Sequence, residues 1–187
     1  MNKKKRFLYA GFDDSNHLGQ TEGEVIVGIF STKREDRLNQ RFPKRRDHQK
    51  VKELLQKSWR DFRFTIILEE ELKRTPYNLP LVMPFLLEDY LSSIREKAYP
   101  SELTLGFDGE LKEREKLILE RDLKPIETAN IFNFTGKTKR HCPLPVYMAD
   151  VHANYLFRTL TVERALSHRK YVPISSRELL ERKKLFE

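Results

Sequence analysis

Apolar and polar positions alternate along this 187-residue chain in blocks that predict strands and helices of ordinary length. Residues 6–13 (RFLYAGFD) are apolar on both faces, which is typical of a central strand in a covered sheet. Residues 24–31 (EVIVGIFS) repeat the pattern, and glycines between the two stretches favour a hairpin. Further strands are predicted at residues 62–68 and 102–108, and a weaker one at 126–134.

Helical periodicity occupies much of the chain between these strands. Residues 81–97 place most apolar side chains on one side of a helix, with Glu88 and Asp89 opposite in a solvated position. Other helices are predicted at 47–58, at 110–121 and, after two prolines that suit a helix start, at about 146–166. Residues 33–46 lack apolar periodicity and are predicted to be a loop.

This order of elements predicts an α/β fold, with a mixed sheet of about five strands and helices on both faces. We expect one domain over residues 1–170, followed by a charged tail or helix over 171–187. Ser175 and Glu178 have the spacing of a capping box at the start of that last helix.

The amino-acid composition indicates the kind of environment in which this chain is expected to fold. The single cysteine, Cys142, excludes a disulfide framework and favours a reducing, cytoplasmic environment. No apolar stretch is long enough to cross a bilayer, so no membrane partner is expected.

Positive charge is clustered on this chain, whose formal net charge is +8. Residues 33–50 hold eight Lys or Arg against three acids, and a second cluster surrounds residues 137–141. Single-signed clusters favour nucleic-acid binding over the alternative, a densely charged surface of the thermophile type. The predicted phosphate contacts are Lys33, Arg34, Arg37, Arg41, Lys44, Arg45, Arg46, Lys137, Lys139 and Arg140.

Four aspartates stand where chain geometry can bring them together. Asp13 and Asp14 end the first predicted strand, Asp108 ends the strand at 102–108, and Asp150 lies in the first turns of the long helix. If the two strands are parallel neighbours, their carboxyl ends form the crevice where open α/β sheets bind ligands. A glycine two residues before Asp13, and another before Asp108, leaves room for a helix backbone to approach closely. Clustered carboxylates are costly to bury without a compensating cation, and all-oxygen ligation suits Mg²⁺ or Mn²⁺.

Three short motifs carry a resemblance to a known family. YAGFDDSNH resembles the opening strand of type 2 ribonucleases H, LTLGFDGEL is similar to their later strand with its Asp-Gly, and PVYMADVHANYLFR is similar to their closing helix. The motifs occur in the family's order along nearly the whole chain. The resemblance implies a ribonuclease H-like fold and a metal-dependent nuclease whose ligands are Asp13, Asp14, Asp108 and Asp150. In such a site two ions flank the scissile phosphate, and Asp13 is the candidate to bridge them.

The sequence also departs from that family. Asp14 stands in place of the usual glutamate, and the glycine-arginine-glycine element that senses a ribonucleotide is replaced by residues 15–18 (SNHL). Size, basicity and motif order look most like small archaeal exonucleases with this fold that are specific for single strands. We therefore expect a 3′–5′ exonuclease on single-stranded DNA, with cleavage of an RNA–DNA hybrid, or binding without catalysis, as alternatives. Phe42, Trp59 or Tyr77 are candidates for stacking on bases.

Overall fold

The computed structural model describes ten stretches of the chain: residues 6–15, 23–43, 48–57, 61–68, 79–94, 100–108, 111–123, 128–134, 141–159 and 162–185. Within them, one sheet has the strand order β4-β2-β1-β5-β6. Strand β2 is antiparallel to both of its neighbours, β4 and β1, whereas β1, β5 and β6 run parallel. The predicted mixed five-stranded sheet is confirmed. Its strands are β1 (Phe7–Ser15), β2 (Gly23–Ser31), β4 (Asp61–Leu68), β5 (Glu102–Asp108) and β6 (Thr128–Phe134).

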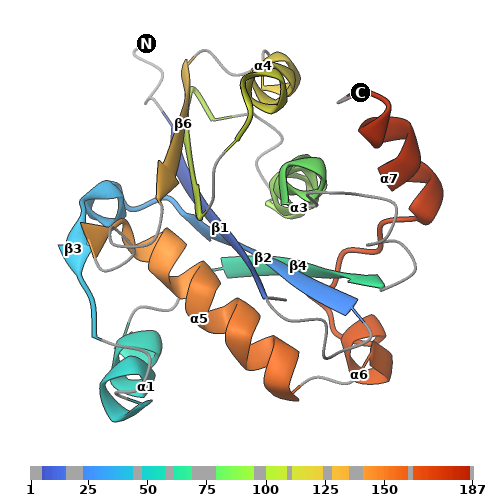
Figure 1. Cartoon of the computed structure of the whole chain (residues 1–187). Coiled ribbons are helices and arrows are strands. Elements are labelled where there is room, and N and C mark those ends of the chain that lie inside the picture. The colour runs from blue at the N-terminus through green and yellow to red at the C-terminus, as the bar shows by residue number, and fades with distance from the viewer. Residues whose placement is uncertain are drawn as a thin grey trace.

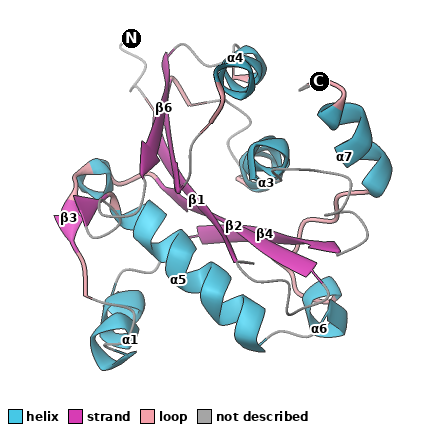
Figure 2. Cartoon of the chain, in the orientation of Figure 1, coloured by secondary structure: helices cyan, strands magenta, loops and turns pink. Residues whose placement is uncertain are grey.

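Helices cover both faces of this sheet, as expected (Figures 1 and 2). On one face lies α3 (Leu79–Ser93), with α4 (Glu113–Asp122) and α7 (Ser176–Lys183) beside it. On the other face α5 (Leu144–Thr159) packs along β1 and β2. The shorter helices are α1 (His48–Lys57) and α6 (Val162–Leu166). None of the helices in the described stretches combines the length and the apolar character needed to span a bilayer.

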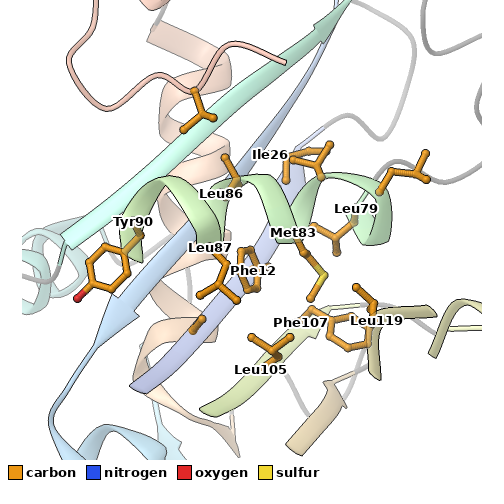
Figure 3. Packing of buried hydrophobic residues seen from close by; sticks show 14 of the residues in the cluster. Phe12, Ile26, Leu79, Met83, Leu86, Leu87, Tyr90, Leu105, Phe107 and Leu119 are labelled. Carbon is orange, nitrogen blue, oxygen red and sulfur yellow. The ribbon is translucent and has the colours of Figure 1, made fainter. Parts of the chain in front are cut away.

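Strict alternation along β1 creates a hydrophobic cluster on each face of the sheet. Leu8, Ala10 and Phe12 are buried in the cluster under α3, and Phe12 packs edge-on against the ring of Phe30. Figure 3 shows Phe12 among the side chains that pack beneath α3. Phe7 and Tyr9 are buried in the cluster under α5. Both faces of β1 are covered, and its residues from Phe7 to Phe12 are apolar or glycine, as the residue pattern predicted.

Two predicted elements differ from the observed ones. The helix predicted at about 146–166 is two helices, since α5 ends at Thr159 and α6 begins at Val162. Thr159 donates from Oγ1 to the carbonyl oxygen of Tyr155 (2.7 Å), a side-chain bond to the backbone of the kind that often bends or weakens a helix.

The segment predicted as a loop, residues 33–46, contains a 3-10 turn, η1 (Arg34–Arg37), and a short strand, β3 (Gln40–Arg41). A buried hydrogen bond holds this turn against the end of β2. The Ser31 hydroxyl donates to Asp36 Oδ2 (2.5 Å), and the backbone N–H of Lys33 donates to Ser31 Oγ (3.1 Å). Such side-chain bonds need no apolar periodicity, so the hydrophobic pattern could not reveal them.

The C-terminal segment joins the edge of the sheet. The backbone N–H of Phe64 donates to the carbonyl of Lys170 (3.1 Å), and the N–H of Val172 donates to the carbonyl of Phe64 (2.8 Å). Beyond this bridge the predicted capping box is confirmed, because the Glu178 N–H donates to Ser175 Oγ (3.2 Å) and the Ser175 N–H to Glu178 Oε2 (2.8 Å). The division into a domain over residues 1–170 and a tail over 171–187 stays a prediction.

Candidate metal centre

Two of the predicted aspartates lie where the pairing of two parallel strands stops, although β1 itself continues to Ser15 beside β2. Strand β1 pairs with β5 in a register that places Gly11 beside Gly106 and Phe12 beside Phe107. The next residues in the two strands are Asp13 and Asp108, so their backbones end the ladder together. The expected parallel neighbourhood of these two strands is therefore confirmed, whereas the side chain of Asp108 lies outside the described part of the chain.

Gly11 lets the backbone of α5 come against β1. A Cβ atom built on Gly11 would lie 2.2 Å from the carbonyl carbon of Pro145 and 2.3 Å from the backbone nitrogen of Val146. No residue with a side chain fits there, so the close approach predicted from the glycine is confirmed. At Gly106 the close atoms belong to side chains, namely the Tyr9 hydroxyl at 2.5 Å and Val146 Cγ2 at 2.6 Å.

This contact point sets the level of Asp150 along the sheet. Helix α5 extends beside β1 in the same general direction (Figure 1). From Gly11 to Asp13 a strand advances by about 7 Å, at roughly 3.3 Å per residue. From Pro145 to Asp150 a helix also advances by about 7 Å, at 1.5 Å per residue. Asp150 therefore lies roughly level with Asp13, on the helix that covers that face.

Burial distinguishes the three aspartates whose side chains are described. Asp13 is 2% exposed and Asp150 is 9% exposed, whereas Asp14 is only half-buried. Asp13 Oδ1 accepts the backbone N–H of Asp14 (2.9 Å), which fixes that carboxylate against the strand end. Asp14 alternates to the α3 face of β1, opposite to Asp13, so it shares a site with Asp13 only by reaching round the end of the strand.

The donor chemistry of Asp13 and Asp150 fits a hard divalent cation. Both are buried carboxylates on elements that pack together, and buried negative charge requires compensation. Oxygen donors favour Mg²⁺ or Mn²⁺ over zinc, and no sulfur or imidazole ligand is needed. Among the side chains that the structure describes, no three His, Cys, Asp or Glu residues are grouped closely enough to hold a metal. The set of four aspartates therefore remains a prediction.

Residues 40–41 of the first basic cluster pair with residues 141–142 in a second, small sheet. Strand β3 pairs antiparallel with β7 (His141–Cys142), with Gln40 opposite Cys142 and Arg41 opposite His141. Residues 33–41 on one side and 141–142 on the other are thereby joined beside the start of α5. Lys33, Arg34 and Arg41 are exposed, as phosphate contacts must be. The side chain of Arg37 and the whole of Lys44, Arg45, Arg46, Lys137, Lys139 and Arg140 lie outside the described residues.

Phe42 is not available to stack on a base, contrary to prediction. It is 6% exposed, and its ring stacks on that of Tyr147 at 4.4 Å between centroids. Phe42 lies in a basic segment without apolar periodicity, so the sequence did not indicate that this residue, just after β3, packs against α5. Trp59 and Tyr77 lie outside the described residues.

Asp89 keeps 44% of its side chain exposed, as its predicted position on the solvated side of the helix implies, but it is also an ion-pair partner. Its carboxylate accepts the Nε–H of Arg63 (2.5 Å), a β4 side chain that is buried to 5% exposure. Helical periodicity placed Asp89 opposite the apolar stripe, but it could not reveal a cation supplied by the neighbouring sheet.

Two polar residues beside the aspartates were not predicted as part of the site. Asn154 donates from Nδ2 to the carbonyl oxygen of Asp150 (2.7 Å) and to Asp150 Oδ1 (3.4 Å). Its spacing of four residues from Asp150 was the available signal. Ser15 is 3% exposed, follows Asp13 on the same face of β1, and has no hydrogen-bond partner for its hydroxyl among the described residues. No pattern in the sequence indicated that the side chain of Ser15 would be buried.

Comparisons with known proteins bear on the fold. No family model matches the sequence, and no curated protein is significantly similar to it. Solved structures do match. A chain of the PCNA:RNase HII complex from Archaeoglobus fulgidus has 16% identity and a TM-score of 0.49, over 93% of this chain and 87% of that one. Ribonuclease H2 from Pyrococcus horikoshii OT3 has 15% identity and a TM-score of 0.50, over 91% of this chain and 83% of that one. The mixed sheet, its strand order and its covering helices thus form a ribonuclease H-like fold.

Proposed function

We propose that this chain is a divalent-metal-dependent nuclease that cleaves phosphodiester bonds of nucleic acid. The observation that carries the proposal is the pair of buried carboxylates, Asp13 on β1 and Asp150 on α5, set level with each other by the close contact at Gly11. Asp108 follows in register at the end of β5 and completes the proposed acidic site, with Asp14 as a fourth ligand. The fold also supports a nuclease function, because ribonuclease H2 from Pyrococcus horikoshii has a similar fold.

The roles of the residues follow from their positions. Asp13, whose carboxylate accepts the N–H of Asp14, would hold the metal together with Asp150 and Asp108. Mg²⁺ or Mn²⁺ held there would activate a water molecule and stabilise the leaving oxyanion. Lys33, Arg34 and Arg41 are the described cations proposed to hold flanking phosphates, at the surface where β3 and β7 meet.

We place the RNA strand of an RNA–DNA hybrid first as substrate. The comparison with a ribonuclease H2 supports this choice over the single-stranded DNA that the sequence favoured. A 3′–5′ exonuclease on single-stranded DNA is the second candidate, since residues 15–18 lack the element that senses a ribonucleotide. The two differ in product, because an exonuclease releases mononucleotides whereas hybrid cleavage leaves the DNA strand intact.

The test is incubation of labelled hybrid, single-stranded DNA, duplex DNA and RNA with Mg²⁺, Mn²⁺ or EDTA. We expect metal-dependent cleavage that falls by at least about 100-fold in Asp13→Asn, because a ligand is lost. Asp89→Asn removes the same charge on α3, across the sheet, and is expected to cleave as the unmodified protein does. Salt-sensitive binding to every substrate without cleavage in any metal would contradict the proposal and favour a binding module.

A further inference from the structure

Helix α5 carries a side chain that bonds both to its own backbone and to a proposed metal ligand. Asn154 lies one turn after Asp150 and is half-buried. Its Nδ2 lies 2.7 Å from the carbonyl oxygen of Asp150 and 3.4 Å from Asp150 Oδ1. An amide NH₂ group has two hydrogens, so one side chain can donate to both oxygens.

Two other polar side chains on this helix bond to the backbone carbonyl four positions back. Thr159 Oγ1 lies 2.7 Å from the carbonyl oxygen of Tyr155, and His152 Nδ1 lies 2.8 Å from that of Met148. Each residue bonds four positions back, as Asn154 does. Asn154 differs from these two residues by its second acceptor, a carboxylate. An asparagine that only stabilised the helix would need only the bond to the backbone carbonyl.

The second bond restricts the Asp150 carboxylate. Asp150 has two side-chain torsions, and a donor fixed to the helix one turn away favours the rotamer that brings Oδ1 toward Nδ2. Partners of this kind orient metal ligands in proteins, and their loss typically weakens metal affinity by about 10- to 100-fold.

We infer that Asn154 is a positioning residue for Asp150, which holds the carboxylate in the orientation that ligates a divalent cation. The inference rests on the proposed function, because it assigns Asp150 to a metal site. Asn154 itself is not a ligand in this assignment. Its amide acts through Asp150, so its removal changes metal affinity and leaves the proposed chemistry intact once metal saturates the site.

The experiment titrates the metal-free full chain with Mn²⁺ in the absence of nucleic acid, followed by electron paramagnetic resonance of the free ion. Asn154→Ala is expected to bind Mn²⁺ about 10-fold more weakly, or worse. Asn154→Ser keeps a hydroxyl that can bond the carbonyl four residues back, but it is too short to reach Oδ1 as well. We expect it to bind Mn²⁺ as weakly as the alanine variant does.

Thr159→Ala is the matched control, since it removes a bond of the same kind from the same helix, and its Mn²⁺ affinity is expected to be unchanged. Thermal unfolding in EDTA shows that each variant is folded, and the serine variant carries the test if the alanine variant is not. Cleavage assays add a second readout, in which the Mn²⁺ concentration for half-maximal rate rises while kcat at saturating Mn²⁺ stays near that of the unmodified chain.

The outcomes separate the two proposals. If the unmodified chain binds Mn²⁺ and either folded Asn154 variant binds it equally well, the positioning role is overturned and the proposed function stands. If the unmodified chain binds no Mn²⁺ and Asp13→Asn changes nothing, the proposed function is overturned and the role of Asn154 falls with it.

Discussion

The contact between Gly11 and α5 allows a quantitative prediction for Gly11→Ala. The new Cβ would lie 2.2 Å from the carbonyl carbon of Pro145, where ordinary contact begins at 3.4 Å. The helix and strand must therefore separate by about 3.4 − 2.2 = 1.2 Å. No side-chain rotation relieves this clash, because the three nearest atoms all belong to the backbone of Pro145 and Val146.

Overpacking of a buried site costs about 1–3 kcal/mol, and a rigid backbone contact belongs at the upper end of that range. We expect a loss of about 3 kcal/mol in the free energy of unfolding, measured by urea titration. For a chain of this size that loss lowers Tm by roughly 6–12 °C. If the proposed site is correct, the same displacement moves Asp150 away from Asp13, and a misplacement of about 1 Å costs on the order of 100-fold in rate.

Gly106→Ala is the control for this reasoning. Its Cβ would meet the Tyr9 hydroxyl and Val146 Cγ2, which can move, so we expect a smaller loss of about 1 kcal/mol. The argument fails if Gly11→Ala unfolds within about 0.5 kcal/mol of the unmodified chain, the range of ordinary surface substitutions. It also fails if Gly106→Ala proves the more destabilising of the two.

Three further predictions concern other parts of the molecule. Thr65→Val is expected to raise the free energy of unfolding by about 1 kcal/mol in urea titration, because the Thr65 hydroxyl is buried without a hydrogen-bond partner among the described residues; a loss of stability would contradict this. Replacing both Lys33 and Arg41 by alanine is expected to weaken nucleic-acid binding and to reduce the slope of log affinity against log salt by about 2, as two phosphate contacts are lost; an unchanged slope would place the phosphates elsewhere. The pKa of Asp61 is lowered from its ordinary value of 3.8, because bonding to Lys170 and the nearby Arg63 charge outweigh desolvation, the largest single effect. The folded state therefore keeps the stabilising charge of Asp61 above pH 3.8 and loses it as the pH falls further. In Asp61→Asn the stability of the fold, followed by circular dichroism, should fall less steeply with pH below that value. An equally steep fall in the variant would contradict a role of this carboxylate in acid unfolding.

The sequence and the structure agree where burial alone decides the local conformation. Strand β5 has the predicted bounds, and β1 and β2 differ from theirs by a residue or two, because their side chains are apolar on both faces. The glycine two residues before Asp13 predicted the close approach of a helix backbone to β1. These features follow from steric rules that act within one or two residues.

Sequence patterns did not predict specific contacts between side chains. The Ser31–Asp36 bond beside η1 is local but follows no apolar period, and the stacking of Phe42 on Tyr147 joins elements that meet only after folding. The second bond of Asn154 is local, but the sequence gives no measure of which rotamer an amide adopts. Hydrophobic periodicity carries no information about such partners, so they became visible only in the folded chain.

The bridge between Phe64 and the C-terminal segment has a consequence for shortened forms of the protein. Strand β4 lies at one end of the strand order, and the backbone of Lys170 and Val172 occupies hydrogen-bonding groups of Phe64 along that border. A chain cut before residue 170 would leave those groups exposed as a template for another strand. Such truncated molecules should self-associate through this border, and they would be poor reagents for any assay that requires a monodisperse sample.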